Sequence, residues 1–454
     1  MALNYAPETN IEATMLRNPK EEHDRPHRHH YDAEMLSVEE ARGRILSYFS
    51  QLSVESTPLL GSLGQVLGER VVAPFHVPQL TNSAMDGYAV FSSDTTGSTK
   101  NAPSVLQVIG VVAAGQVTDQ PLKPGTAIRI MTGAPVPQNA DAVVPFEDTD
   151  ELERGETVKS DDTVAIHIEA EPNDNIRQAG EDIRAGDKVF EAGHILGAGE
   201  VGVIASLGRS EIQVVRRPVV AIVSTGDELL QPGEEYRPGK IYNSNAYSIA
   251  AMVTKYGGIP SVQGIAKDTV ESLETALDGA LAADLVVTSA GVSKGDYDVV
   301  KDVLASKGEI ALWSVRMRPA KPLAFGLLDR KDGTRVPHLG LPGNPVSAMV
   351  AFEQFGRPAM RFMMGKPQVE KPSIDVLMDD PINNYDGRRV YARVHVYVDD
   401  SGAYRAKLTG NQSSGALSSM ATANGLAICP DDIGMIDVDE IAKVEMLDWP
   451  DDIF

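Results

Sequence analysis

Five carboxylates follow three short apolar runs in the middle of the chain: Asp227, Glu228, Asp268, Asp296 and Asp298. Crowded carboxylates repel one another unless a positive charge lies between them. A divalent cation such as Mg²⁺ provides that charge, because it takes hard oxygen ligands and usually holds phosphate oxygens as well. The pattern therefore indicates a magnesium site formed by members of this set.

Groups suited to anions accompany the carboxylates. A glycine-rich segment at 289–298 offers backbone N–H groups to phosphate, and three cations follow the next predicted strand. Cations, backbone donors and a bound metal are together typical of phosphate-ester or phosphoanhydride chemistry. A solvated basic loop is the alternative for the cations. The expected anion-binding positions are Ser289, Gly291, Ser293, Gly295, Arg316, Arg318 and Lys321.

Short apolar runs alternate with helical patterns from residue 216 to residue 367. Strands that alternate with helices form a parallel sheet covered on both faces. Ligands bind outside the carboxyl ends of such strands, so the carboxylates should meet at one edge. The expected strand and helix pairs are 219–223 with 244–256, 262–266 with 269–281, and 285–288 with 297–304; a further strand, 338–341, precedes Pro342, Gly343, Asn344 and Pro345.

Some of these residues also have a purely structural interpretation. Asp268 fits the N-cap of the following helix, and Asn344 before Pro345 fits an N-cap followed by the first helical position. Asp86 and Thr132 lie among turn-forming residues, and local sequence alone favours turns there. The convergence of several carboxylates on one edge favours the functional interpretation for the central segment.

The remaining segments have other patterns. Ser37 and Glu40 predict a capping box at the start of a helix of about three turns, and 193–207 also has helical spacing. Residues 76–171 and 368–454 consist of short alternating runs broken by Gly and Pro, which is typical of β structure. The first β region therefore interrupts a helical unit.

Residues 1–32 are polar and contain a histidine cluster: His23, His27, His29 and His30. This composition predicts a disordered tail. Imidazoles at such spacing could alternatively bind a metal ion.

The overall composition excludes some classes of protein. A formal net charge of -23 disfavours nucleic acid and anionic membranes as partners, because both need a basic surface. The single cysteine, Cys429, excludes an intrachain disulfide. No apolar stretch approaches the roughly 20 residues that span a bilayer, and the first residues lack a secretory signal pattern, so a cytoplasmic protein is expected.

Six motifs, in order along residues 36–454, resemble those of the molybdopterin molybdenumtransferase family and of the related gephyrin E domain. They are Asn-Ser-Ala-Met-Asp-Gly-Tyr-Ala (82–89), Met-Thr-Gly-Ala-Pro-Val-Pro (131–137), Gly-Glu-Asp-Ile (180–183), Ser-Thr-Gly-Asp-Glu-Leu (224–229), the glycine loop (289–298) and Gly-Leu-Pro-Gly-Asn-Pro-Val-Ser-Ala (340–348).

The resemblance implies an elongated homodimer of four domains. These are a discontinuous helical domain I (33–75 and 172–215), an inserted β domain II (76–171), a three-layer α/β/α molybdopterin-binding domain III (216–367) and a C-terminal β-barrel, domain IV (368–454). The family's active cleft lies between domain III of one subunit and domain II of the other. Transient contact with molybdopterin adenylyltransferase and with molybdoenzymes is also expected.

The resemblance further implies that molybdenum from molybdate is inserted into adenylylated molybdopterin, with divalent-cation-dependent release of AMP. The catalytic positions carried over are Asp86, Thr132, Asp182, Glu228, Asp268 and Asp298, of which Asp86, Glu228, Asp268 and Asp298 are the expected Mg²⁺ ligands. Arg318 and Lys321 match or adjoin the family's basic positions, and Pro342 and Pro345 match its proline positions.

Three residues depart from the family pattern: Lys294, Ser314 and Ala320 stand where an apolar residue, a basic residue and a glycine are common. Arg316 could supply the charge that Ser314 lacks. Two alternatives remain open for the function. One is molybdopterin adenylyltransferase, which resembles the α/β body alone, and the other is a gephyrin-like scaffold that binds a partner peptide.

Overall fold

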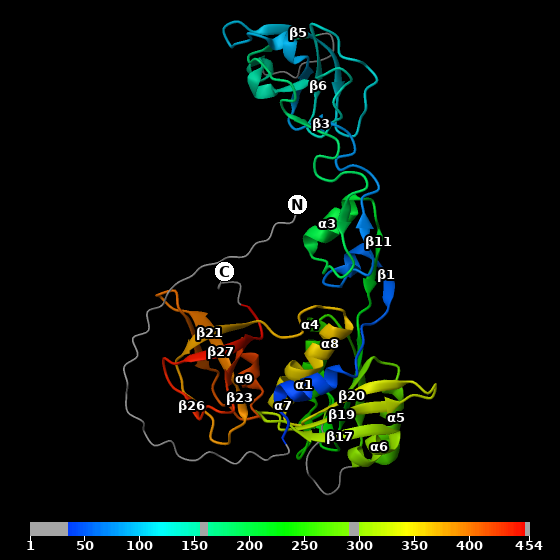
Figure 1. The fold of residues 1–454 in the computed structure, drawn as a ribbon, viewed down its shortest axis with the longest axis vertical. Helices are drawn as coiled ribbons and strands as arrows, with labels where there is room; N and C mark the ends of the chain where they lie inside the picture. Colours follow the sequence, from blue (N-terminus) through cyan, green and yellow to red (C-terminus); the bar gives the residue numbers. More distant parts are fainter. Residues whose placement is uncertain (1–34, 155–161, 290–298, 450–454) are drawn as a thin grey trace.

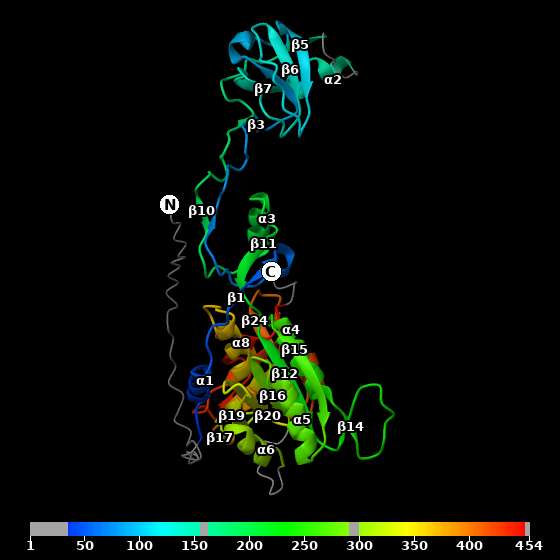
Figure 2. The same cartoon turned by 90° about the vertical axis from the view of Figure 1, so that its right-hand side faces the viewer.

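The computed structural model describes residues 35–154, 162–289 and 299–449. The molecule is long: a β module occupies one end of its longest axis, and an α/β body with an adjoining barrel occupies the other (Figures 1 and 2). A small unit of strands and one helix lies between them. The histidine-rich tail, Lys294 and the predicted sites Gly291, Ser293, Gly295 and Asp298 lie outside the described residues.

The α/β body is built on a six-stranded sheet in the order β15-β12-β16-β20-β19-β17. The first four strands are parallel, and β19 and β17 are antiparallel to their neighbours. The strands are β12 (Val219–Thr225), β15 (Ile259–Ala266), β16 (Leu285–Ser289), β17 (Gly308–Ser314), β19 (Pro322–Asp329) and β20 (Arg335–Leu341). The runs of β12, β15, β16 and β20 are the predicted ones, extended by up to three residues, whereas no range was predicted for β17 or β19.

Helices cover both faces of this sheet, which confirms the predicted three layers. One face packs against helices α4 (Ser244–Lys255), α7 (Pro345–Ala351) and α8 (Arg357–Met363). The other face packs against α5 (Val270–Ala280) and α6 (Val299–Lys307). In α5 the buried residues Leu273, Leu277 and Ala280 recur at helical spacing, so one stripe of the helix faces the sheet.

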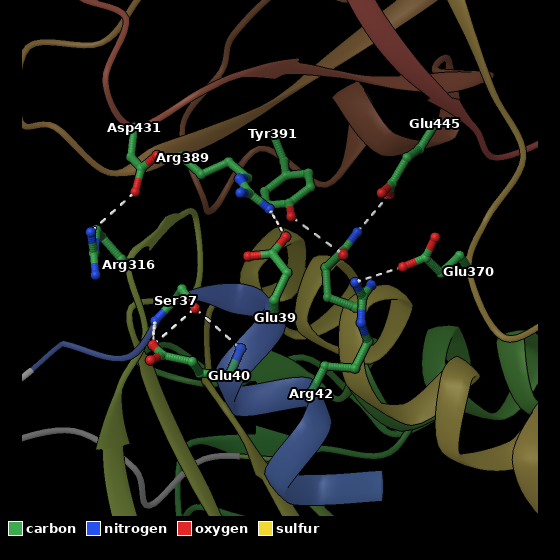
Figure 3. A network of polar contacts seen from close by, with 11 residues as sticks. Ser37, Glu39, Glu40, Arg42, Arg316, Glu370, Arg389, Tyr391, Asp431 and Glu445 are labelled. Carbon is green, nitrogen blue, oxygen red and sulfur yellow. Dashed lines mark hydrogen bonds and ion pairs between the residues drawn. The ribbon is translucent and has the colours of Figure 1, made fainter.

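The first helix, α1 (Val38–Leu46), packs against α8 and shares the core of the α/β body. Its predicted capping box is present: Ser37 Oγ accepts the N–H of Glu40, and the Glu40 carboxylate accepts the N–H of Ser37. Figure 3 shows how polar contacts join α1 to the barrel, through Glu39 with Arg389 and through Arg42 with Glu370 at 3.3 Å. The helix is therefore held between two domains.

The unit in the middle of the molecule contains helix α3 (Ala198–Ser206), within the predicted helical segment, and two antiparallel strand pairs. One pair joins β1 (Val54–Pro58) to β11 (Glu211–Val215), and the other joins β2 (Val71–Val72) to β10 (Lys188–Phe190). These pairs bring together segments from before and after the insertion. The unit is thus formed by two separate stretches of chain, and strands contribute to it as much as its helix does.

The inserted module is a five-stranded sheet in the order β7-β4-β6-β5-β8. Its strands are β4 (Gly87–Val90), β5 (Ser104–Val112), β6 (Thr126–Ile130), β7 (Ala142–Pro145) and β8 (Thr163–Ile166). A short pair, β3 (Asn82–Ser83) with β9 (Ile176–Arg177), closes the module where the chain enters and leaves it. Two extended stretches of chain then connect it to the middle unit (Figure 1).

The C-terminal domain is a closed barrel of five strands. The order β23-β24-β21-β27-β25 closes through pairing of β25 with β23. The strands are β21 (Ser373–Met378), β23 (Arg389–Val398), β24 (Tyr404–Leu408), β25 (Gly425–Cys429) and β27 (Ile441–Met446), and a two-residue strand of the α/β body, β18 (Met317–Arg318), pairs with β23. Within the described ranges, no helix is long and apolar enough to cross a lipid bilayer.

Candidate active site

Three of the five predicted carboxylates of the α/β body, Asp227, Glu228 and Asp268, meet at one edge of its sheet, whereas Asp296 and Asp298 lie outside the described residues. Thr225 pairs with Ala266, Ser224 with Ser289, and Ser289 with Leu341, so β12, β15, β16 and β20 end side by side. Because β19 runs antiparallel to β20, its first residues lie at this same edge, and so does the end of β17. We call this the carboxyl edge; the acidic loops and the segment with Arg318 and Lys321 all leave the sheet here.

Asp227 and Asp268 contact each other at the carboxyl edge. The N–H of Asp227 donates to Asp268 Oδ2 at 3.2 Å, and the N–H of Asp268 donates to Asp227 Oδ1 at 3.3 Å. The N-cap of α5 is Thr269, whose side chain accepts the N–H of Ser272. The capping interpretation of Asp268 is therefore wrong, and its exposed carboxylate is available for another role.

Glu228 lies beside this pair, and Gly226 makes room for it. Gly226 has φ of +143°, a conformation that disfavours other residues, and a Cβ built there would lie 2.4 Å from Glu228 Oε2. The Glu228 carboxylate thus folds back over the turn that follows β12. It is exposed, like those of Asp227 and Asp268.

The turn after β20 is tied to the end of β16. Pro342 is buried, Gly343 and Asn344 are exposed, and Asn344 is the N-cap of α7 with Pro345 at its start, as predicted. The Asn245 side chain reaches both strands: its Nδ2 lies 2.7 Å from Ser289 Oγ and 2.8 Å from the Gly343 carbonyl oxygen. Asn245 was not among the predicted site residues, because it lies in the first turn of an ordinary amphipathic helix.

His338 provides an uncharged support behind the carboxyl edge. It lies in β20 and is fully buried, and its Nε2 is 3.0 Å from Thr288 Oγ1. Burial lowers the pKa of this imidazole to about 3, so it is neutral at physiological pH. The positive charge of the site must therefore come from elsewhere.

Arg318 supplies such a charge in a cavity of about 620 Å³ between the α/β body and the barrel. Its guanidinium lies over the Tyr385 ring, 4.3 Å from the ring centre, and its Nη1 is 3.6 Å from Asp386 Oδ2. Asp386 also pairs with Arg388, and the Arg388 guanidinium helps to hold the pKa of Asp386 below its usual value against the effect of burial. The carboxylate therefore offsets only part of the local positive charge.

Arg393 adds a further cation to the wall of this cavity. Its side chain is 2% exposed, yet its hydrogen bonds go to neutral oxygens: Ser419 Oγ at 3.1 Å and the carbonyls of Asn411 and Ser413 at 3.2 Å. Burial lowers the pKa of Arg393 to about 10, which still leaves it charged. A buried guanidinium with neutral partners favours an anionic ligand.

Other lining residues suit the same chemistry. Ser347 in α7 and Ser413 and Ser414 in the barrel border the cavity, and the Ser414 carbonyl accepts the N–H of Val346 at 3.0 Å. Ala320 lines it too, with φ of +76°, in the left-handed region where glycine is most common. The signal that could have identified Arg393 is a charged residue at the centre of a strand, 389–398, that is apolar except for Arg389 and His395.

The other two predicted cations are placed differently. Arg316 lies 3.3 Å from Asp431 in the barrel (Figure 3). Its Nη2 is 3.5 Å from the Met35 carbonyl oxygen. Its charge is thus directed toward the barrel. Lys321 is half-buried directly before β19, at the carboxyl edge, and its carbonyl accepts the N–H of Val315 at 2.8 Å.

Asp86 and Thr132 lie in the inserted module, at the opposite end of the molecule from the α/β body (Figures 1 and 2). The N–H of Thr132 donates to Asp86 Oδ1 at 2.6 Å, and this bond lowers the pKa of the Asp86 carboxyl. Asp182 is exposed on the connecting stretch, where its N–H donates to the Val77 carbonyl at 3.1 Å. A single chain therefore does not bring these three residues to the carboxyl edge.

The four predicted metal ligands are consequently not assembled within the described part of one chain. Glu228 and Asp268 share the carboxyl edge, Asp86 is remote, and Asp298 is not described. No cluster of three or more His, Cys, Asp or Glu suited to a metal occurs among the described residues. Exposed carboxylates at one edge nevertheless fit Mg²⁺, which needs only one or two protein carboxylates when substrate phosphates and water complete its ligands.

The fold and this site define a class: an α/β protein with carboxylates and cations gathered at one edge of its sheet, extended by an inserted β module and a C-terminal barrel. Comparison with known families agrees. Residues 36–208 match the family described as MoeA N-terminal region (domain I and II), residues 221–361 match a probable molybdopterin binding domain, and residues 375–447 match the MoeA C-terminal region (domain IV).

The chain belongs to the molybdopterin molybdenumtransferase family. It is 39% identical to molybdopterin molybdenumtransferase 2 of Mycobacterium tuberculosis over 88% of this chain and 96% of that protein. It is 32% identical to the molybdopterin molybdenumtransferase of Haemophilus influenzae over 90% of this chain and 98% of that protein. A crystal structure of the molybdopterin biosynthesis MoeA protein of Pyrococcus horikoshii superimposes with a TM-score of 0.73 and 29% identity over 92% of this chain and 100% of that one.

Proposed function

We propose that this protein is a molybdopterin molybdenumtransferase: it takes molybdate and adenylylated molybdopterin, releases AMP, and leaves molybdenum on the pterin dithiolene. Family membership supports this assignment, as does the domain content, which extends over most of the length of the named relatives. The adenylyltransferase alternative requires only the α/β body and leaves the inserted module and the barrel without a role.

One structural observation carries the proposal. The exposed carboxylates of Asp227, Glu228 and Asp268 share the carboxyl edge with the segment from which Arg318 enters its cavity. A phosphoanhydride and an oxyanion both need positive groups, and acidic groups beside them are useful when a cation is shared between protein and substrate. The edge thus provides binding groups for two anionic substrates side by side.

Each part of the site has a defined task in this proposal. Arg318, with Arg393 behind it, binds molybdate in the cavity. Lys321 and the Ser289 hydroxyl bind the phosphate of adenylylated molybdopterin, and the Pro342 to Pro345 turn shapes the wall beside it. Glu228 and Asp268, with Asp298, would hold Mg²⁺, whose charge would neutralise the phosphoanhydride oxygens. Arg316, which faces Asp431, contributes to domain contact instead.

We also propose that the active site is completed by a second copy of the chain. Asp86 and Thr132 are exposed on a module held far from the carboxyl edge of its own chain. A homodimer in which the inserted module of one subunit reaches the α/β body of the other would bring them to the site. Cytoplasmic location, and transient contact with the adenylyltransferase and with molybdoenzymes, belong to the same proposal.

An assay of substrate use tests the function. Purified protein with adenylylated molybdopterin, molybdate and Mg²⁺ should release AMP and yield active molybdenum cofactor. AMP formation from ATP and molybdopterin would instead support the adenylyltransferase. The scaffold alternative would be supported if the protein consumes neither substrate pair and also fails to restore molybdoenzyme activity in a deletion strain.

A further inference from the structure

Asn245 is fixed at the carboxyl edge by the start of α4. The N-cap Asn243 accepts the N–H of Ala246 at 3.2 Å and receives Ser224 Oγ at 3.2 Å on the same oxygen, Oδ1. The beginning of the helix is therefore attached to the end of β12. From this position the Asn245 side chain reaches Ser289 of β16 and Gly343 of the turn after β20.

The chemistry of the partners fixes the orientation of the Asn245 amide. The Gly343 carbonyl can only accept, so the group 2.8 Å from it must be the Nδ2 donor. That nitrogen carries two hydrogens, and the second points to Ser289 Oγ at 2.7 Å. Ser289 Oγ therefore accepts a hydrogen bond from Asn245, and its own O–H hydrogen remains for another acceptor.

Two hydrogen-bonding groups are consequently available at this point. Ser289 is 3% exposed, and the Asn245 Nδ2 group beside it cannot accept its hydroxyl hydrogen. Asn245 Oδ1 is buried and has no hydrogen-bond partner among the described residues. Buried polar atoms normally have hydrogen-bond partners. The Ser289 hydroxyl and Asn245 Oδ1 lie side by side at the carboxyl edge, which indicates that a bound ligand provides the partners of both groups.

We propose that Asn245 is a positioning residue of the substrate site. By donating to both Ser289 and Gly343, it turns the Ser289 hydroxyl toward an anionic oxygen of the substrate, and its Oδ1 accepts an N–H or O–H of the same molecule. It also ties the strand end that carries Ser289 to the turn that begins α7. This inference rests on the proposed function, because adenylylated molybdopterin provides both the phosphate oxygen and the donors.

Steady-state kinetics and calorimetry with adenylylated molybdopterin test the proposal. Asn245→Ala should raise KM, and the calorimetric Kd, roughly ten-fold, the effect of one hydrogen bond to a charged group, with a smaller change in kcat. Asn245→Asp, which is similar in size, should raise both constants further, because its carboxylate accepts the Ser289 hydroxyl hydrogen and repels the substrate. Thr254→Ala, at the far end of α4, is the matched control.

A double-mutant cycle separates positioning from simple structural support. If Asn245 acts partly through Ser289, Asn245→Ala should raise Kd by a smaller factor in the Ser289→Ala protein than in the wild type, because only the Oδ1 contact with the substrate remains to be lost. Multiplying effects, or a wild-type Kd for Asn245→Asp, would overturn the inference. Wild-type protein that binds no adenylylated molybdopterin would instead refute the proposed function. If Asn245→Ala does not fold, Asn245→Asp and Ser289→Ala decide the question.

Discussion

Asp227 and Asp268 hold each other in place: each carboxylate accepts the backbone N–H of the other residue, at 3.2 and 3.3 Å. Each loop thereby fixes the position of the other, although the residues are 41 positions apart in sequence. Only part of each carboxylate is used in this way, since a carboxylate can accept about four hydrogen bonds. The pair is therefore both a structural link and a source of free oxygen ligands.

Asp268→Asn separates these two roles. The amide oxygen can still accept the N–H of Asp227, so the loop should keep its position, but the negative charge is lost. If Asp268 holds the cation, turnover should fall by about 100-fold with little change in Kd for adenylylated molybdopterin. AMP release at several Mg²⁺ concentrations measures this. Asp278→Asn, on the outside of α5, is the control, and full activity of Asp268→Asn at limiting Mg²⁺ would exclude the metal role.

Arg318→Gln tests the oxyanion cavity. The substitution keeps much of the side-chain volume beside Tyr385 and removes the charge. We expect KM for molybdate to rise about ten-fold or more, because a charge-assisted contact is lost, while Kd for AMP changes little. Arg405→Gln, whose guanidinium pairs with Asp379 and Asp439 in the barrel, should leave KM unchanged. Equal effects of the two substitutions would contradict a specific role for the cavity.

Mixing two inactive variants tests the intersubunit site. Asp86→Ala damages the inserted module, and Asp268→Ala damages the carboxyl edge. In a mixed dimer with shared sites, one of the two sites receives both intact residues. Random exchange of equal amounts makes about half of the dimers mixed, so about a quarter of the wild-type activity should be restored. The measurement is AMP release after subunit exchange. If each site is built from one chain, the mixture should stay as inactive as its components.

Lys371→Met is expected to destabilise the contact between the α/β body and the barrel. Lys371 pairs with Glu353 at 2.7 Å, and their side chains are only 7% and 3% exposed. Removing one partner leaves a buried charge, which typically costs about 3 to 5 kcal/mol. Urea unfolding measures the loss. The double variant Lys371→Met with Glu353→Leu should recover most of it, and an equal loss in both variants would show that packing, and not charge, is responsible.

Lys366 should make stability depend on pH. Burial lowers its pKa to about 8, and the nearby Arg361, Arg217 and Arg357 contribute. Below that pH the ammonium group is charged in both the folded and the unfolded protein, and the cost of burying this charge disfavours folding. Between about pH 8 and 10.4 the unfolded chain keeps the proton that the folded protein loses, so the free energy of unfolding rises with pH.

Lys366→Met should therefore be more stable than wild type at neutral pH, by roughly 1 kcal/mol once solvent screening is allowed for. The difference should shrink as the pH rises toward 10. Urea unfolding of both proteins at four pH values between about 7 and 10 measures it. A difference that is constant with pH would mean that the methionine acts through packing alone.

The sequence alone determined the four parallel strands of the α/β body and the residues at their ends. The apolar runs of β12 and β16 are short and continuous, as buried parallel strands require, and the residues that follow them are chemically distinctive. Parallel strands must end at one edge, so the meeting of Glu228 and Asp268 followed from the pattern. The capping box at Ser37 was equally local, because it depends on residues three apart.

Only the tertiary structure decided which polar groups belong together. Thr269, not Asp268, caps α5, because the backbone turns one residue later than the sequence suggested. Arg316 and Arg318 are two residues apart, a spacing that puts both side chains on the same side of a regular extended chain, yet Arg316 pairs with Asp431 and Arg318 lines the cavity. Asn245 and Arg393 belong to ordinary elements. Asn245 became a candidate site residue through its contacts with Ser289 and Gly343, which are 44 or more residues away in sequence. Arg393 became one because the closed barrel buries its side chain. Sequence patterns report periods of two to four residues, and long-range contacts of this kind leave no such period.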